Sequence, residues 1–328
     1  MRILVVRLGA LGDVVHTVPA VAALAAALPE ARIDWLVDRR HAPVLELFAL
    51  PVRRVPVDPS RSWRETVRAV RALRAEGYDA ALDFQGLLKS ALFARFSGAR
   101  RVIGFDRPAL REPLAGAFYT EHVPVSLDLH IIRKNLALAG ALGVHDDEIR
   151  MPLVEGIRRP PVLEASAPVV LNPGAGWPNK RWPPERFGGL ASVIRHEHGV
   201  RSLVTWGPDE RGLAEEVVEA SGGAASLAPA TTIADLMRLL AQARLMVSGD
   251  TGPIHLAAAV GCPVVGIYGP TNPARNGPWA AADRCLSRFA ICECHHKRRC
   301  TAARWCLGRV EVGEVAALVS DRLGSIAG

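Results

Sequence analysis

Short runs of β-branched residues alternate along the chain with Ala- and Leu-rich stretches of helical periodicity. This alternation is typical of βα units and parallel sheets. In the first half, the pattern predicts helices that separate strands over 2–6, 33–37, 54–57, 80–83 and 101–103. One helix, over 63–74, is amphipathic, because its apolar residues and its arginines fall on different faces.

A second series begins at residue 169. It predicts strands over 169–172, 202–206, 245–248 and 264–268, and helices over 184–198, 209–220, 233–242 and 252–260. The proline-rich stretch before it has no periodicity, which indicates a linker. We therefore predict an α/β protein with Rossmann-like domains over 1–155 and 169–311, a linker over 156–168, and a final helix over 312–328 assigned to neither domain. Ligands are expected in a cleft at the carboxyl ends of the strands.

The composition is that of an ordinary soluble protein, with 49% hydrophobic and 22% charged residues among 328. The longest apolar runs are shorter than the roughly 18 residues of a membrane span. Only four apolar residues lie between Arg2 and Arg7, which is too few for a secretory signal. We therefore expect no transmembrane segment, a cytoplasmic location and reduced cysteines.

The net charge of +7 is distributed unevenly. Residues 39–111 contain 15 Lys and Arg against 7 Asp and Glu, and residues 284–309 contain 7 basic residues against one Glu. Such windows suggest an anionic partner. Nucleic acid, a membrane surface and an acidic small molecule are the three alternatives. A solvated surface is the alternative explanation for each window.

Three loops that follow predicted strands carry candidate chemistry. The first, RLGALGDVVH over 7–16, is a GxxG turn that lacks the spacing of dinucleotide-binding and P-loop motifs. Its glycines let the backbone turn sharply, which places Asp13 at a helix N-terminus facing the predicted cleft. Asp13 is therefore either a helix cap or a functional carboxylate.

The other two loops suit phosphate groups. PGAGWPNKRWPPERF over 173–187 has small residues before Lys180, as in a phosphate-binding loop, although a plain loop explains the pattern as well. SGDTGPIH over 248–255 runs from a strand end into a helix, where Asp250 or Thr251 is a potential cap. Free backbone N–H groups at that helix start would suit a diphosphate.

Together with DFQGLLKSA, REPLAGAFY, WGPDE and the continuation LAAAVGCPVVGIYGPTNP, these loops resemble the ADP-heptose:lipopolysaccharide heptosyltransferases, glycosyltransferase family 9. The resemblance runs from residue 1 to about 279 and implies two domains of the GT-B fold. DFQGLLKSA and REPLAGAFY most resemble the first heptosyltransferase, which adds heptose to the Kdo residue of the lipid A inner core. The expected partners are thus ADP-heptose and an anionic Kdo–lipid A acceptor, with peripheral contact at the inner membrane and no nucleic acid.

The resemblance also implies roles for single residues. Asp13 would be the catalytic base of an inverting transfer, and the acceptor would contact Arg61, Arg64 and Arg111. The donor would contact Ala175, Gly176, Lys180, Glu210, Thr231, Asp250, Thr251, Gly252 and His255. Ala175 and Gly176 replace a threonine pair of the first-type enzymes, which implies backbone contacts to phosphate. Lys180 and the helix start near Thr251 would take the place of a divalent metal, since the chain has no Asp-x-Asp pair.

The cysteine-rich tail is a separate candidate site, with Cys292, Cys294, Cys300 and Cys306 beside His295 and His296. Four thiols are a potential structural zinc site, although the paired CxxC spacing is missing. Reduced cysteines able to form a disulfide, or plain packing, are the alternatives. The tail looks more like that of second-type heptosyltransferases, so a second heptose or a hexose transfer stays open. An epimerase of the same fold and a noncatalytic sensor are further alternatives.

Overall fold

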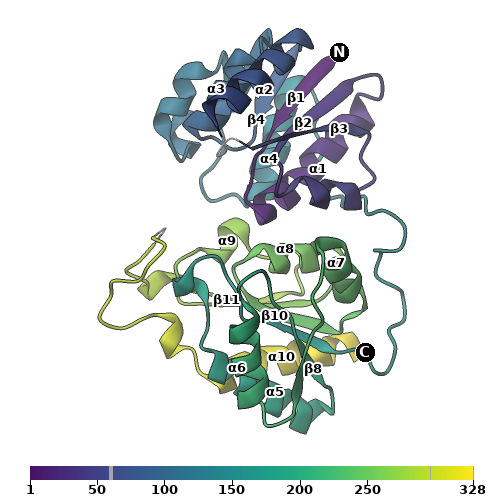
Figure 1. Ribbon diagram of the computed structural model, residues 1–328, viewed down its shortest axis with the longest axis vertical. Helices are drawn as coiled ribbons and strands as arrows, with labels where there is room; N and C mark the ends of the chain where they lie inside the picture. Colours follow the sequence, from purple (N-terminus) through teal and green to yellow (C-terminus); the bar gives the residue numbers. More distant parts are fainter. Residues whose placement is uncertain (59–61, 296, 328) are drawn as a thin grey trace. The chain divides into compact units, whose positions relative to one another are not determined.

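The computed structural model describes residues 1–58, 62–295 and 297–327. The chain divides into two compact units, Met1–Val154 and Glu155–Gly328 (Figure 1). Residues 156–168, the predicted linker, contain no helix or strand. Among the described residues, no helix is both long enough and apolar enough to cross a membrane.

The first unit is built on a parallel sheet of six strands in the order β3-β2-β1-β4-β5-β6. The strands are β1 Arg2–Val6, β2 Arg32–Asp38, β3 Val52–Val57, β4 Ala80–Asp83, β5 Arg101–Phe105 and β6 Glu121–Val123. The helices are α1 Leu11–Ala27, α2 Trp63–Ala75, α3 Leu88–Phe96 and α4 Ile131–Ala139, with short 3-10 helices η1 Ala42–Leu47, η2 Arg107–Ala109, η3 Pro113–Phe118 and η4 Gly140–Leu142. α1 packs on α4, and α2 packs on α3, on opposite faces of the sheet (Figure 1).

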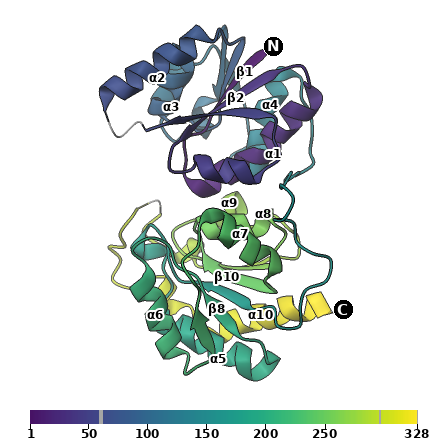
Figure 2. The ribbon, with the colours of Figure 1, turned by 45° about the vertical axis from the view of Figure 1, so that its right-hand side comes forward.

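The second unit repeats this plan, with the strand order β9-β8-β7-β10-β11-β12. The strands are β7 Val169–Asn172, β8 Ser202–Val204, β9 Ala225–Leu227, β10 Leu245–Gly249, β11 Val264–Tyr268 and β12 Arg284–Ser287. The helices are α5 Pro184–His198, α6 Arg211–Ala220, α7 Ile233–Gln242, α8 Gly252–Ala259, α9 Pro273–Asn276 and α10 Val312–Ala327, with η5 Pro178–Lys180, η6 Phe289–Ile291 and η7 Leu307–Arg309. The final helix, α10, packs against α5 and β11, so it belongs to this unit (Figure 2).

Numbered within each unit, both sheets have the order 3-2-1-4-5-6, which is that of Rossmann folds. The predicted α/β class and the nine predicted strands are therefore confirmed. The sequence pattern missed β6, β9 and β12. Each is three or four residues long and lies at a sheet edge, where partial exposure replaces the continuous apolar run that marks a central strand.

The strand order reverses between β1 and β4 in the first unit and between β7 and β10 in the second. Open α/β sheets bind ligands outside the carboxyl ends of their strands at such points. The loop that follows β1 carries Asp13, and the loop that follows β7 carries Lys180. The DFQG segment follows β4, and the loop that carries Asp250 follows β10. Each unit thus places two of the motif-bearing loops at its own point of reversal.

Candidate active site

Asp13 lies in the first turn of α1 with its carboxylate half exposed. One oxygen, Oδ2, accepts a hydrogen bond from the Ala10 N–H at 3.1 Å, and the other, Oδ1, is 2.8 Å from Arg7 Nη2. The Asp13 side chain is 43% exposed, whereas that of Arg7 is 5% exposed. Asp13 therefore caps the helix while its carboxylate stays accessible, so the two predicted roles are compatible.

Arg7, which the sequence reading did not single out, is fixed by the DFQG segment. Its guanidinium donates to the Phe84 carbonyl, and the N–H of the next residue, Leu8, donates to Gln85 Oε1 at 2.8 Å. The segment begins with the buried Asp83, which accepts from Tyr119 Oη at 2.7 Å. Burial raises the pKa of Asp83 although several groups donate to its carboxylate. The β4 loop thus holds the arginine that in turn holds Asp13.

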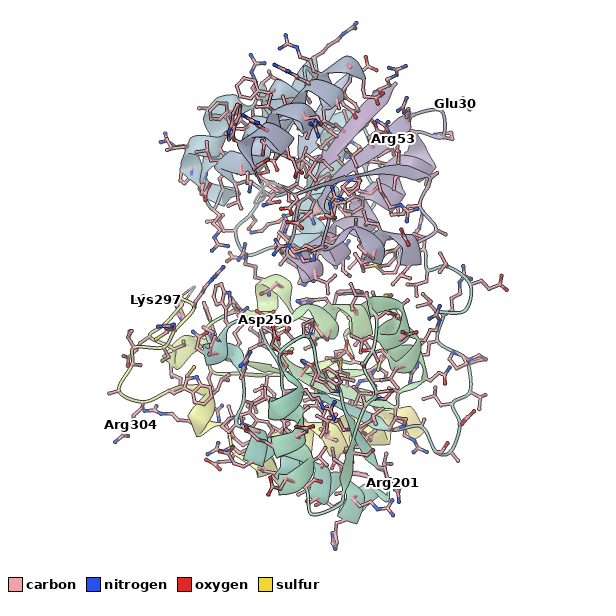
Figure 3. All side chains as sticks on the ribbon, in the orientation of Figure 1. Glu30, Arg53, Arg201, Asp250, Lys297 and Arg304 are labelled. Atoms are coloured by element: carbon pink, nitrogen blue, oxygen red, sulfur yellow. The ribbon has the colours of Figure 1, made fainter. Side chains whose placement is uncertain are left out.

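In the second unit, Lys180 and Asp250 form a buried ion pair. Lys180 Nζ lies 2.5 Å from Asp250 Oδ2, and the two side chains are 16% and 5% exposed. The same ammonium lies 4.7 Å from the centre of the Trp177 ring, where a cation is attracted to the aromatic face. Figure 3 labels Asp250 among the side chains of this unit. The pair is possible because β7 and β10, which precede the two residues, are neighbours in the sheet.

Asp250 has two further partners. Asn276 Nδ2 donates to its Oδ1 at 3.0 Å, and His255 Nε2 lies 3.5 Å from the same oxygen. Burial raises the pKa of Asp250, but the His255 hydrogen bond and the charge of Lys180 outweigh this and hold the pKa well below its usual range. Asp250 is therefore a fixed negative charge at neutral pH. Asn276 was missed in the sequence because 26 residues separate it from Asp250.

The N-terminus of α8 adjoins this ion pair. Thr251 is the N-cap residue and Gly252 and Pro253 form the first turn, yet no described side chain caps the helix, so the predicted cap by Asp250 or Thr251 is not formed. Gly249, just before it, is required by close backbone packing, because a Cβ there would lie 2.7 Å from the Lys180 carbonyl oxygen. The ammonium and the positive end of a helix thus lie on adjoining segments, as an anion-binding site needs.

Glu210 belongs to a second cluster, around the loop after β7. Its Oε1 accepts from Arg181 at 3.3 Å, and Arg181 also donates to the Ala175 carbonyl at 2.9 Å. A Cβ on Gly174 would lie only 2.0 Å from the Glu210 carboxylate, so this glycine is needed for the contact. A Cβ on the exposed Gly176 would meet open space. Arg181, which the sequence pattern did not indicate, thus connects the loop after β7 to the residue that precedes α6.

Thr231 stands apart from these contacts. It is half-buried and immediately precedes Thr232, the N-cap residue of α7. Thr232 exchanges hydrogen bonds with Asp235 in a capping box, so the start of α7 is well fixed. Thr231 therefore lies on a rigid helix entry.

The predicted acceptor residues are dispersed over the first unit. Arg64, in the first turn of α2, and Arg111, just before η3, are both exposed, and Arg61 lies outside the described residues. Part of the basic window is already neutralised within the fold. Arg53, labelled in Figure 3, pairs with the buried Asp34 at 2.5 Å and with Glu76 at 2.7 Å. The charge excess available to a ligand is therefore smaller than the residue count suggests.

Where the chain is described, no three His, Cys, Asp or Glu side chains are grouped so that they could hold a metal ion. The zinc alternative for Cys292, Cys294, Cys300 and Cys306 is therefore not supported. Cys294 and Cys300 bring their sulfur atoms within 3.0 Å of each other as hydrogen-bonded thiols. Two sulfur ligands of a tetrahedral zinc would be about 3.8 Å apart, given zinc–sulfur bonds of about 2.3 Å. His296 lies outside the described residues.

Comparison with known proteins identifies the family. Residues 66–306 match the family described as "Glycosyltransferase family 9 (heptosyltransferase)". The chain is 33% identical to lipopolysaccharide heptosyltransferase 1 of Pseudomonas aeruginosa, over 92% of this chain and 88% of that protein.

Two solved structures of Escherichia coli heptosyltransferase WaaC, one with ADP and one with ADP-2-deoxy-2-fluoro heptose, are similar over the whole fold. Both have a TM-score of 0.76 and 26% sequence identity. The alignment covers 99% of this chain and 98% of the other for the ADP structure, and 98% and 99% for the second. The chain therefore belongs to glycosyltransferase family 9, the heptosyltransferase family, and is a glycosyltransferase of the GT-B fold.

Proposed function

We propose that this glycosyltransferase transfers heptose from ADP-heptose to the Kdo residue of the lipopolysaccharide inner core, with inversion at the anomeric carbon. The observation that carries the proposal is the buried pair of Lys180 and Asp250 beside the uncapped start of α8, at the point of strand reversal in the second unit. This arrangement suits a diphosphate. The relative from Pseudomonas aeruginosa, named lipopolysaccharide heptosyltransferase 1, supports the choice of sugar and acceptor.

The second unit would bind the donor. Lys180 has three N–H donors and gives one to Asp250, so the others are available to the diphosphate. The diphosphate would also accept from backbone N–H groups at Gly252 and near Gly176. Glu210 would accept from the ribose hydroxyls, while Thr231 would line the adenine pocket. The remaining donor contacts would come from Ala175, Asp250, Thr251 and His255.

Asp13 would act as the general base. It removes the proton from the acceptor hydroxyl while the oxygen of that hydroxyl attacks the anomeric carbon. The bond between this carbon and the ADP phosphate breaks, and its electron pair leaves with ADP. Lys180 and the α8 amides stabilise the negative charge that develops on the phosphate, so the reaction would need no divalent cation. The half-exposed Asp13 carboxylate, fixed by Arg7, supports this role.

The acceptor would be bound by Arg61, Arg64 and Arg111, because Kdo carboxylates and lipid A phosphates are anionic. Since such an acceptor is anchored in a bilayer, the enzyme would act in the cytoplasm, at the inner membrane surface. Trp63 is 72% exposed, and the Arg64 guanidinium lies 5.7 Å from the centre of its ring, a combination that suits a lipid headgroup region. Sedimentation with anionic and neutral vesicles tests this location, and equal binding to both would contradict it.

One panel assay tests the reaction. The protein is incubated with ADP-heptose and with lipid A acceptors that carry Kdo alone or Kdo already bearing one heptose, while ADP release and acceptor mass are followed. A gain of one heptose on the Kdo-only acceptor is expected. Transfer only to the heptose-bearing acceptor would identify a second-heptose enzyme instead. Donor conversion without any acceptor would identify an epimerase.

A further inference from the structure

The segment 292–306 contains four of the six cysteines, and neither the fold nor the proposed reaction uses their chemistry. Cys292, Cys294 and Cys306 are buried in the apolar core of the second unit, and Cys300 is half-buried. Cys294 and Cys300 are in direct contact, since their sulfur atoms are 3.0 Å apart. A disulfide requires about 2.05 Å. Closing the bond therefore needs a movement of only about 1 Å.

The two thiols are chemically unequal. The Cys294 sulfur shares a hydrogen bond with the Cys300 sulfur and accepts one from the Thr301 N–H at 3.2 Å. These contacts lower the pKa of Cys294, whereas burial and the neighbouring Cys294 raise the pKa of Cys300. Burial raises the pKa of Cys306 to about 12. Cys294 is thus favoured as the thiolate, the form that reacts with oxidants.

We propose that Cys294 and Cys300 form an oxidation site that hydrogen peroxide converts to a disulfide. The Cys294 thiolate attacks one peroxide oxygen and the O–O bond breaks, which gives a sulfenic acid and, after protonation of the leaving hydroxide, water. The Cys300 sulfur then attacks the sulfenic sulfur, an S–S bond forms, and the hydroxyl leaves with the Cys300 proton as a second water. Overall, two thiols and one peroxide give a disulfide and two waters. Cys300 is the more exposed thiol, so a peroxide that reaches it lies beside Cys294.

The oxidation site is connected to the turn that carries Lys180. Asn179, which is 5% exposed, donates from Nδ2 to the Lys297 carbonyl at 2.8 Å, and Lys297 lies between the two cysteines in sequence. Trp305 Nε1 donates a hydrogen bond to the Asn179 carbonyl at 3.3 Å. Figure 3 labels Lys297 at the edge of the second unit. Movement of about 1 Å at the sulfurs is therefore transmitted to the residue next to Lys180, and oxidation should change the affinity for ADP. That readout rests on the proposed function.

Peptide mapping tests the disulfide independently of activity. The whole protein is treated with hydrogen peroxide, alkylated and digested with trypsin, which separates residues 289–297, 300–304 and 305–309 because each peptide ends at Lys or Arg. We expect the first two peptides to be linked, with fragmentation locating the bond at Cys294, and dithiothreitol to release them. Cys300→Ser should abolish the link, whereas Cys285→Ser, which changes a cysteine outside the segment, should leave it intact.

Three outcomes would overturn the proposal. They are no disulfide in a folded protein, a disulfide that joins other cysteines, and a stoichiometric zinc ion in the untreated protein by native mass spectrometry. Cys300→Ala is measured beside Cys300→Ser, so that a folding defect in one variant leaves the other as the test. If the oxidation site is connected to the turn that carries Lys180, oxidation should shift the Kd for ADP at least threefold. The shift should be reversible and should occur only where Cys300 is present. An unchanged Kd in the disulfide form would refute that link, whereas failure of ADP to bind even the reduced protein would refute the proposed function.

Discussion

Replacing Lys180 with methionine is expected to lower the free energy of unfolding by about 3 kcal/mol. Methionine keeps the length and apolar stem of lysine but removes the ammonium that lies 2.5 Å from Asp250. Breaking a buried ion pair by removing one partner costs roughly 3–5 kcal/mol, because an uncompensated charge stays buried. Asp250 is 5% exposed but keeps contacts with Asn276 and His255, so the lower end of that range applies.

The assay is urea unfolding at pH 7 of the wild type, Lys180→Met, Asp250→Asn and the double variant. The double variant removes the buried charge altogether, so it should be more stable than Lys180→Met alone. A Lys180→Met protein within 1 kcal/mol of the wild type, or a double variant that loses the sum of both single effects, would refute the assigned energetics.

Acidification provides a second check on the same pair. The pKa of Asp250 is depressed in the folded protein, so its ionised form stabilises the fold at pH values above the ordinary aspartate pKa of about 3.9. That contribution is lost as the pH falls below this value towards the lower folded pKa. The wild type and Lys180→Met should therefore converge in stability below about pH 4. A constant difference between pH 7 and pH 3 would contradict the argument.

Four further outcomes are expected. Asp13→Asn keeps the cap but removes the proton acceptor, so turnover at saturating substrates should fall roughly 10²- to 10⁴-fold while ADP binding persists; near-normal turnover would leave Asp13 a cap only. Replacing Arg64 and Arg111 together with Ala should raise the KM for the acceptor, mostly at low salt, and a rise in the donor KM alone would show that the ligands are assigned to the wrong units. Turnover should persist in excess EDTA, and loss restored by Mg²⁺ would contradict the role of Lys180. Gly174→Ala should weaken ADP binding, because the new Cβ would lie 2.0 Å from the Glu210 carboxylate, with Gly212→Ala in α6, whose Cβ would meet open space, as the control.

The sequence predicted the central strands because their side chains are buried on both faces, as in β4, where every residue of Ala80–Asp83 is buried. It also located Asp13, Lys180 and Asp250, because each follows such a strand. It did not reveal that Lys180 and Asp250 contact each other, since 70 residues separate them and the contact depends on which strands are neighbours. Arg7 was missed for a different reason. An arginine directly after a strand has no local signature, and its burial depends on the distant Phe84.

The strand order has a kinetic consequence for the donor loops. Apart from the central pairs β1–β4 and β7–β10, neighbouring strands pair residues 18 to 33 positions apart, as Val169 and Ser202 do, whereas Val169 and Leu245 of β7 and β10 are 76 positions apart. The contact between Lys180 and Asp250 thus requires closure of a long chain segment, which makes it a late event on the folding pathway. Late contacts are largely absent from the transition state, so their loss accelerates unfolding and leaves the folding rate almost unchanged. Stopped-flow measurements on Lys180→Met should accordingly show a much higher unfolding rate than in the wild type. By the same reasoning, a nucleotide bound at Lys180 should slow the unfolding of the wild type.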